Sequence, residues 1–598
     1  MFLQGILKLF RVIEEKALEG IQNRLSKYNP SRFFNPSSSL MEILLPLLLV
    51  IFIVIRFFRI LDNFWLFDDP LILKHAVLYR PWEYFFVPTV WQKGTMSNFT
   101  PWIIFSFALD WKIFGLHPFG FYLHHLMSLC VLSVLAYFVL RLWFSTSLSF
   151  WGVLLFAASP PFADSAQTLF VRHYIEGFIF ASLSVYCFAK GLREDRKWLG
   201  IPGALLYLLA TSAKEIYVPL PFLLLLLHEK SVIIRLRRIL PWLVISLAYV
   251  FWRWFMLGRF SGGYSEASTW FHNVTLLLPK ITDAMGGGPR GAVPWWRWLI
   301  GSSSLLTGIV LFVTDRKSLL WVLMASPLLL LPIIPVTSIM SPRYVWLLLF
   351  FWILVHIITW GKVNKAMKRL PVRALIWSWG VLLLSGFVYV SFMNSSLTQG
   401  DIKDQGREGM FVLQQGTATD LIVIQNNGGW PYYSGLYWLR QHVLHLPEGP
   451  SVTADSKIIC LERFLRKTDS NVINSFEHVW YFDPQKRTLA SEDIADFCGR
   501  ESLQGIKKDV PLSVKVNYSD ATFSWEFGPY NKGEYALFLG QTSESCVVLP
   551  KKGKAFISFR GENLPLRLRY VSPEGWRCYS PLMTLAVTDD HGVIQWQR

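Results

Sequence analysis

Long apolar stretches dominate residues 40–394 and restrict what this chain can fold into. The first, LMEILLPLLLVIFIVI, begins at Leu40, and later ones are centred near residues 130, 155, 182, 205, 222, 247, 305, 327, 352 and 383. A membrane-spanning helix needs roughly 20 apolar residues, so the pattern corresponds to about eleven spans. Hydrophobic residues form 53% of the chain and charged residues 17%, against about 25% charged in soluble proteins. The sequence therefore predicts a polytopic α-helical membrane protein.

Basic residues are concentrated in every second loop between the apolar stretches. These loops begin at Arg141, Lys190, Arg235, Asp315 and Gly361. Cytoplasmic loops carry an excess of Lys and Arg, so the basic loops are expected in the cytoplasm. The net charge of +17 is thus explained by membrane topology, and a nucleic-acid partner is not expected.

The loop pattern divides the chain into three predicted parts. Residues 1–39 have apolar side chains at helical spacing and predict a cytoplasmic amphipathic segment. Residues 40–394 form the transmembrane domain, with an outer loop at residues 62–120. An odd number of spans then places residues 395–598 outside the cytoplasm.

The last part is expected to be a β-rich soluble domain, because short alternating strands lie between Gly, Pro and Asn residues. SEDIADFCGRESL predicts a short helix capped by Ser491. The aromatic stretch GGWPYYSGLYWLRQH (Gly428–His442) either stacks on sugar rings or forms ordinary core. The domain holds four cysteines, which permit disulfides in three pairings or remain reduced thiols: Cys460, Cys498, Cys546 and Cys578.

Ionisable residues recur where the apolar stretches reach the outer side. Asp68 and Asp69 follow the first stretch. A carboxylate at the membrane–water boundary serves as a general base or metal ligand, although a solvated acid pair at a helix end is the simpler interpretation. Arg and Lys are the expected ligands for phosphate, while snorkelling or a Lys214–Glu215 ion pair would explain single cases. The other outer ends carry Asp164, Arg172, His173, Lys214, Glu215, Arg343 and Tyr344.

Several stretches, taken in order, resemble a known family of membrane enzymes. They are Asp68–Asp69, TPWIIFSFALDWKIFGLHPFGFYLHHL (Thr100–Leu126), SPPFADSAQ followed by VRHYIEG, SAKEIYVPLPFLLLLLHE (Ser212–Glu229), and SPRYVWLL from Ser341. The series resembles the GT-C fold glycosyltransferases, which take sugars from polyprenyl-phosphate donors. It is most similar to the bacterial relatives of the transmembrane O-mannosyltransferases with tetratricopeptide repeats, although the sequence shows no such repeat. Glu176 matches the family's pattern only loosely, and Pro342 replaces an acid before the Arg-Tyr pair.

The resemblance implies an inverting hexosyltransferase on the outer face of the membrane. The donor would be a polyprenyl-phosphate-linked sugar, and the acceptor a hydroxyl of a protein, lipid or glycan. It implies Asp68 as the general base, assisted by Asp69. Donor phosphate would bind Lys214, Arg172 and Arg343, which stabilise the charge on the leaving group. The supporting residues would be Asp164, Glu215, His173 and Tyr344.

Two further points stay open in the sequence. No cofactor is assigned, and dependence on a divalent cation is left open. A lipid-linked sugar flippase or transporter is the alternative function, although transporters place ionisable residues near the bilayer midplane and often contain repeats. The expected location is a bacterial inner membrane, with the N-terminus in the cytoplasm and the C-terminal domain in the periplasm.

Overall fold

The computed structural model describes most of the chain after residue 35. The predicted amphipathic segment at residues 1–39 therefore lies almost entirely outside the described residues. These comprise 36–598 apart from 96, 228, 259, 261–269, 287–293, 367–369, 425–428, 459, 461–475, 484–485, 487, 501–503, 508, 520–521, 541–542, 544, 557–562 and 588–590.

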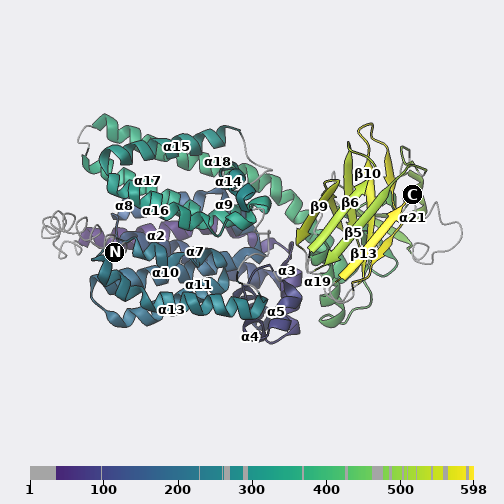
Figure 1. The fold of residues 1–598 in the computed structure, drawn as a ribbon, viewed down its shortest axis with the longest axis horizontal. Coiled ribbons are helices and arrows are strands. Elements are labelled where there is room, and N and C mark those ends of the chain that lie inside the picture. Colours follow the sequence, from purple (N-terminus) through teal and green to yellow (C-terminus); the bar gives the residue numbers. More distant parts are fainter. Residues whose placement is uncertain are drawn as a thin grey trace, which may run out of the picture.

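A bundle of helices forms the first two thirds of the described chain (Figure 1). Its α-helices are α2 (Pro36–Phe57), α3 (Asp69–Leu78), α4 (Glu83–Phe86), α5 (Pro88–Gly94), α6 (Trp102–Phe114), α7 (Pro118–Arg141), α8 (Thr146–Ala158), α9 (Pro160–Gln167), α10 (Arg172–Arg193), α11 (Gly200–Ala213), α12 (Leu220–Leu225), α13 (Val232–Leu257), α14 (Trp270–Met285), α15 (Pro294–Thr314), α16 (Arg316–Leu330), α17 (Trp346–Ala366) and α18 (Leu370–Met410). Short 3-10 helices join them, including η2 (Phe58–Asp62), η3 (Leu169–Val171), η5 (Glu215–Tyr217) and η8 (Pro342–Val345).

Helices occupy all of the positions predicted from the apolar stretches. Within the described residues, six helices are long and apolar enough to cross a membrane. A seventh span is formed if α8 and α9 are taken together, although they are bent by 57°. Pro160 and Pro161 explain the bend, because proline cannot continue the hydrogen bonding of the preceding helix. A polytopic helical membrane protein is confirmed, whereas the predicted number of about eleven spans is not.

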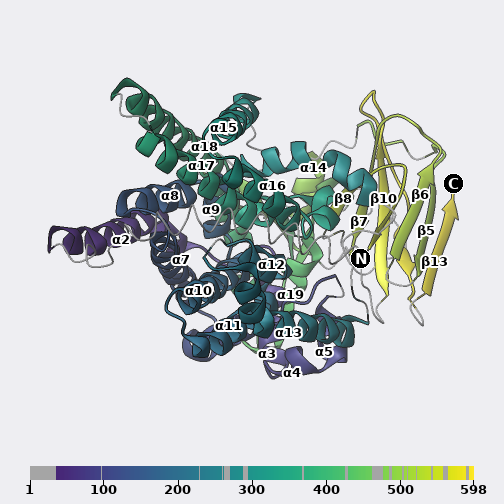
Figure 2. The same ribbon diagram turned by 60° about the vertical axis from the view of Figure 1, so that its left-hand side comes forward.

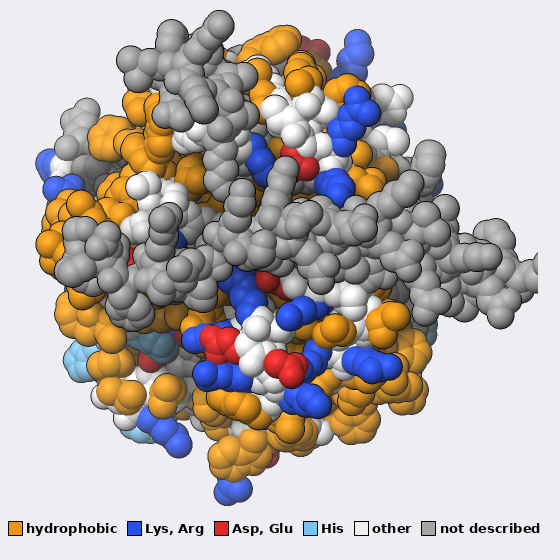
Figure 3. Space-filling view, turned by 90° about the vertical axis from the view of Figure 1, so that its left-hand side faces the viewer, with side chains coloured by type: hydrophobic (Ala, Val, Ile, Leu, Met, Phe, Trp, Pro, Cys, Tyr) orange, Lys and Arg blue, Asp and Glu red, His pale blue; other side chains and the backbone are white. Residues whose placement is uncertain are grey.

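The basic loops come together at the end of the bundle away from the strands. Arg141 Nη2 lies 2.7 Å from Glu42 Oε1, so the start of α2 and the end of α7 share this end. Lys362 Nζ lies 2.5 Å from Asp315 Oδ2 in the same way, between α17 and the turn before α16. Figure 3 faces this end and shows Lys and Arg side chains gathered with acidic ones, bordered by hydrophobic surface. Alternate loops therefore share one end, and the Asp68 segment lies near the other.

The C-terminal region begins with a small α/β unit that shares the bundle's hydrophobic core. The predicted boundary after residue 394 falls inside α18, which continues to Met410 and a π-helical turn, Phe411–Gln415. The helix α19 (Gly429–His442) crosses between two parallel strands and contributes Tyr432 and Leu436 to the core of the bundle. The sheet has the order β2-β1-β3-β4, with β1 (Asp420–Val423), β2 (Ser451–Thr453), β3 (His478–Asp483) and β4 (Thr488–Asp493).

The rest of the C-terminal region is a β-sandwich with its own core. Figure 2 shows its two sheets as separate layers. One sheet has the order β11-β10-β7-β8 with β12 paired to β10, and the other has the order β13-β5-β6-β9. Inward residues of both sheets form one cluster, including Val516 opposite Trp525 on one sheet and Leu568 on the other. The strands are β5 (Ser513–Ser519), β6 (Thr522–Gly528), β7 (Glu534–Leu539), β8 (Ser545–Leu549), β9 (Lys552–Phe556), β10 (Leu564–Val571), β11 (Arg577–Tyr579), β12 (Met583–Leu585) and β13 (His591–Gln597).

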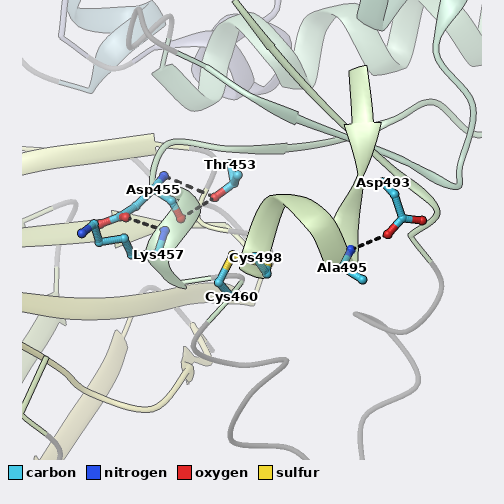
Figure 4. The surroundings of a disulfide bond; sticks show 7 residues. All are labelled: Thr453, Asp455, Lys457, Cys460, Asp493, Ala495 and Cys498. Atoms are coloured by element: carbon cyan, nitrogen blue, oxygen red, sulfur yellow. Dashed lines mark hydrogen bonds between the residues drawn. A yellow bond between two sulfur atoms is a disulfide. The ribbon is translucent and has the colours of Figure 1, made fainter. Parts of the chain in front are cut away.

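One disulfide lies in the α/β unit (Figure 4). It joins Cys460 to Cys498 in α21 (Ile494–Arg500), while Cys546 and Cys578 form no disulfide within the described structure. The α21 helix is the one predicted from SEDIADFCGRESL, but it begins later than expected. Asp493 rather than Ser491 caps it, since the Asp493 carboxylate accepts a hydrogen bond of 2.6 Å from the Ala495 N–H.

Candidate active site

The two adjacent aspartates at the start of α3 have different surroundings. The turn before α3 places Phe67 at a φ of 45°, a strained conformation for a residue with a side chain. Asp69 is fully buried, and its Oδ2 accepts a hydrogen bond of 2.9 Å from the Leu66 N–H. Asp68 is exposed and lines a cavity. Asp69 therefore stabilises the turn, while Asp68 is available for chemistry.

The cavity beside Asp68 has a volume of about 350 Å³. Separate segments of the chain form its wall: α3, the segment from α4 to α6, the residues leading into α10, Lys214 after α11, and η8 before α17. Several lie at the ends of apolar helices, so the cavity is at the end of the bundle that carries the Asp68 segment. It brings together five residues that were predicted from the sequence: Asp68, His173, Lys214, Arg343 and Tyr344.

The two cations of the cavity lie against aromatic rings. Lys214 is buried, and its Nζ is 4.8 Å from the centroid of the Tyr174 ring. The Arg343 guanidinium carbon is 5.2 Å from the centroids of both the Phe170 and Tyr344 rings. In the described part of the chain, neither cation has a carboxylate within ion-pair distance. Two positive charges beside a cavity without such a partner favour an anionic ligand.

The surroundings of Asp68 and Lys214, two of the ionisable residues that line the cavity, shift their pKa values in ways that suit different roles. Desolvation by the surrounding protein raises the pKa of the Asp68 carboxyl group, and the charge of Arg343 opposes this shift. Burial lowers the pKa of Lys214 to about 8, a shift that Glu215 opposes and Arg343 increases. An ionised carboxylate with a raised pKa is a stronger base. Most Lys214 side chains remain charged at neutral pH, because pH 7 lies below this pKa.

Arg172 does not line the cavity and lies in a buried ion network between α6, α7 and α10. Its Nη1 donates to Asp110 Oδ2 at 2.5 Å, and its Nε lies 3.6 Å from Glu176 Oε1. His124 lies beside the same two carboxylates, with Nδ1 2.7 Å from Asp110 Oδ1 and Nε2 3.4 Å from Glu176 Oε1. The structure therefore pairs Arg172 with protein carboxylates and does not bring it together with Lys214 and Arg343.

Glu215 and Asp164, the other residues predicted from the sequence, lie outside the cavity lining. Glu215 Oε1 accepts hydrogen bonds from Arg253 Nε at 2.8 Å and from the Phe99 N–H at 3.0 Å. Glu215 therefore forms its ion pair with Arg253. In the described structure, Lys214 and Glu215 are not within ion-pair distance of each other. Asp164 is half-buried on α9 and does not line the cavity, but it interacts electrostatically with Arg343.

Sequence reasoning missed the other end of the cavity. His75 on α3 lines this end together with Tyr84, Trp91 and Asn98 of the following segment. His75 follows Asp68 by seven residues, which is close to two helical turns and places both on one face of α3. That spacing is the signal by which His75 could have been identified from the sequence.

The aromatic stretch predicted at Gly428–His442 forms core, since its Tyr432 and Tyr433 are fully buried.

Metal binding can be tested against the residues of the cavity. The described residues contain no group of three or more His, Cys, Asp or Glu side chains placed to hold a metal ion. Asp68 is the only carboxylate among the described lining residues. A divalent cation such as Mg²⁺ or Ca²⁺ takes about six or more oxygen ligands, so this donor set alone does not fit one.

No protein family model and no curated protein sequence matches this chain. Among solved structures, the chain is similar to ArnT from Cupriavidus metallidurans bound to undecaprenyl phosphate. The match has 11% sequence identity and a TM-score of 0.38, and it covers 74% of this chain and 93% of the ArnT chain. At this TM-score the likeness carries no argument about function.

Proposed function

We propose that the chain is a GT-C-type membrane glycosyltransferase that transfers a hexose from a polyprenyl-phosphate donor to an acceptor hydroxyl. One observation carries this proposal: the Asp68 carboxylate shares a cavity with Lys214 and Arg343, which form no ion pair in the described part of the chain. The cavity lies at helix ends, where the phosphate of a membrane lipid would lie. The resemblance of the sequence motifs to GT-C glycosyltransferases supports the same reaction.

In the proposed reaction, the carboxylate and the two cations of the cavity have different roles. The Asp68 carboxylate accepts the proton of the acceptor hydroxyl, whose oxygen attacks the anomeric carbon of the sugar. A new glycosidic C–O bond forms as the bond from the anomeric carbon to the phosphate oxygen breaks. The polyprenyl phosphate leaves with the bonding electrons, and Lys214 and Arg343 stabilise the negative charge that develops on it. Attack opposite the leaving group inverts the configuration at the anomeric carbon.

The acceptor hydroxyl belongs to a protein, a lipid or a glycan. We place the reaction on the outer face of the membrane, because the cavity lies away from the basic loops, where Arg141 and Lys362 are found. The proposed membrane is a bacterial inner membrane, whose outer face borders the periplasm.

Release of sugar from radiolabelled polyprenyl-phosphate hexoses by the purified protein tests the proposal. Each donor would be assayed with and without a chelator, in parallel with a binding measurement for the same donor. Hydrolysis or transfer from at least one donor is expected. Tight binding of a donor without any release, with and without candidate acceptors, would overturn the enzyme assignment and favour the flippase alternative.

A further inference from the structure

The cavity has a second polar end, about two helical turns from Asp68. Asp68, Leu71, Ile72 and His75 all line the cavity, with the spacing of one helix face. Seven residues of helix correspond to about 10 Å along its axis. His75 therefore lies at a distance from the reacting centre that corresponds to the far side of a sugar ring or to a bound acceptor.

The hydrogen bonds of His75 determine which of its nitrogens carries the proton. The Tyr84 hydroxyl donates its single proton to the backbone carbonyl oxygen of His75 at 2.9 Å. The same hydroxyl oxygen lies 3.0 Å from His75 Nδ1, so in this contact it acts as the acceptor and Nδ1 as the donor. A neutral imidazole protonated on Nδ1 has a bare acceptor at Nε2. Burial lowers the pKa of His75 to about 4, with a contribution from Lys74, which keeps the ring neutral near pH 7.

The bare nitrogen lies beside a glycine that lines the same cavity. His75 Nε2 is 3.5 Å from the position that a side-chain carbon on Gly94 would take, and Gly94 also lines the cavity. No described residue donates a hydrogen bond to this nitrogen. The neighbouring lining residues are neutral, such as Trp91, Thr95 and Asn98. His75 is 8% exposed and lines the cavity, so its Nε2 can accept a hydrogen bond from a ligand there.

We propose that Nε2 of His75 accepts a hydrogen bond from a hydroxyl group of the substrate and thereby determines which substrate the cavity takes. This inference rests on the proposed glycosyltransferase function and defines the neutral end of its site. Asp68, Lys214 and Arg343 bind the reacting and anionic groups, and His75 with Tyr84 binds a hydroxyl away from them. The hydroxyl belongs either to the donor sugar or to the acceptor.

Paired variants separate the loss of the hydrogen bond from the loss of the ring. His75→Phe removes the acceptor and keeps an aromatic ring, whereas His75→Gln keeps an oxygen acceptor near the position of Nε2. Rates would be measured for release of sugar to water from polyprenyl-phosphate mannose and glucose and from their deoxy analogues. We expect His75→Phe to lower kcat/KM by about 10- to 100-fold, mainly through KM, and His75→Gln to recover part of this loss.

The deoxy analogues identify the hydroxyl and distinguish a contact from a folding defect. One deoxy donor should be used equally well by the wild type and by His75→Phe, since it lacks the group that Nε2 accepts from. Equal release but weaker transfer to an acceptor would assign the hydroxyl to the acceptor. The inference is overturned if release and transfer are both unchanged in His75→Phe, or if release to water from every donor and deoxy analogue falls by the same factor.

Failure of the proposed function would give a different result. In that case the wild type itself would release no sugar from any donor. Binding of the same polyprenyl-phosphate sugars and deoxy analogues would then still test the hydrogen bond, because His75→Phe should weaken binding of the parent sugar and leave one deoxy analogue unaffected. Unchanged binding of every donor and of every candidate acceptor would refute it.

Discussion

Substitution of Gly435, a residue of the C-terminal region, by alanine should displace the Asp68 turn of the candidate active site. Gly435 is buried on α19 and lies against the backbone of α3, directly after the two aspartates. A side-chain carbon at this position would be 2.5 Å from the Pro70 carbonyl carbon and 2.6 Å from the Leu71 nitrogen. Both atoms belong to the backbone, so no flexible side chain can move aside.

The size of the stability loss follows from how far α19 and α3 would have to move apart. Ordinary contacts of this kind begin at 3.4 Å, so α19 and α3 would have to separate by about 1 Å. Overpacking of this kind costs about 1–3 kcal/mol, while replacement of a helical glycine by alanine contributes up to about 1 kcal/mol in the opposite direction. We expect a net loss of about 1–2 kcal/mol in stability. A displacement of Asp68 by about 1 Å lowers kcat by roughly 100-fold.

Sugar release and thermal unfolding in detergent would be measured on the same preparations. Gly308→Ala on α15 is the matched control, because nothing lies within 4 Å of the added carbon, and it should leave both quantities close to the wild type. Turnover by Gly435→Ala within twofold of the wild type, at an unchanged Tm, would show that α19 does not position the aspartate turn.

Two other predictions concern charged groups near the cavity. Raising the pH through about 8 removes the proton of Lys214, so affinity for a short-chain polyprenyl phosphate should fall between pH 7 and 9.5. The Lys214→Arg variant should retain its affinity over this range. Equal pH profiles for the wild type and this variant would contradict the assignment of Lys214 to the phosphate. Arg172→Met leaves Asp110 and Glu176 without their buried cation and should lower stability by about 3–5 kcal/mol. Thermal unfolding in detergent measures this loss, and a Tm equal to that of the wild type would show that the network is not structural.

The membrane architecture could be predicted because it depends on simple quantities. Apolar length determines where helices cross, and the charge of the loops determines which ends lie together. The continuation of α18 through residue 394 was missed, because the end of an apolar stretch marks the membrane boundary and not the end of a helix. The helix α19 (Gly429–His442) was not predicted either. This helix is stabilised by burial against α3, a contact that local sequence does not contain.

The site could be predicted in part for a similar reason. Asp68, Lys214 and Arg343 are recognisable because each is a charge beside an apolar stretch. Whether such a charge faces a ligand or a protein partner depends on tertiary contacts. Arg172 has the same signature, but it is paired with Asp110, which lies 62 positions away in the sequence. No local pattern distinguishes these two cases.

The most direct test of the central claim compares turnover and donor binding in Asp68→Asn. Asp62→Asn, which alters an exposed aspartate just before the same segment, is the control. A general base contributes about 100- to 10,000-fold to the rate, so Asp68→Asn should lose at least 100-fold in sugar transfer. It should bind the polyprenyl-phosphate donor at least as tightly as the wild type, since a negative charge near the phosphate is removed. Transfer by Asp68→Asn within tenfold of the wild type would contradict the account.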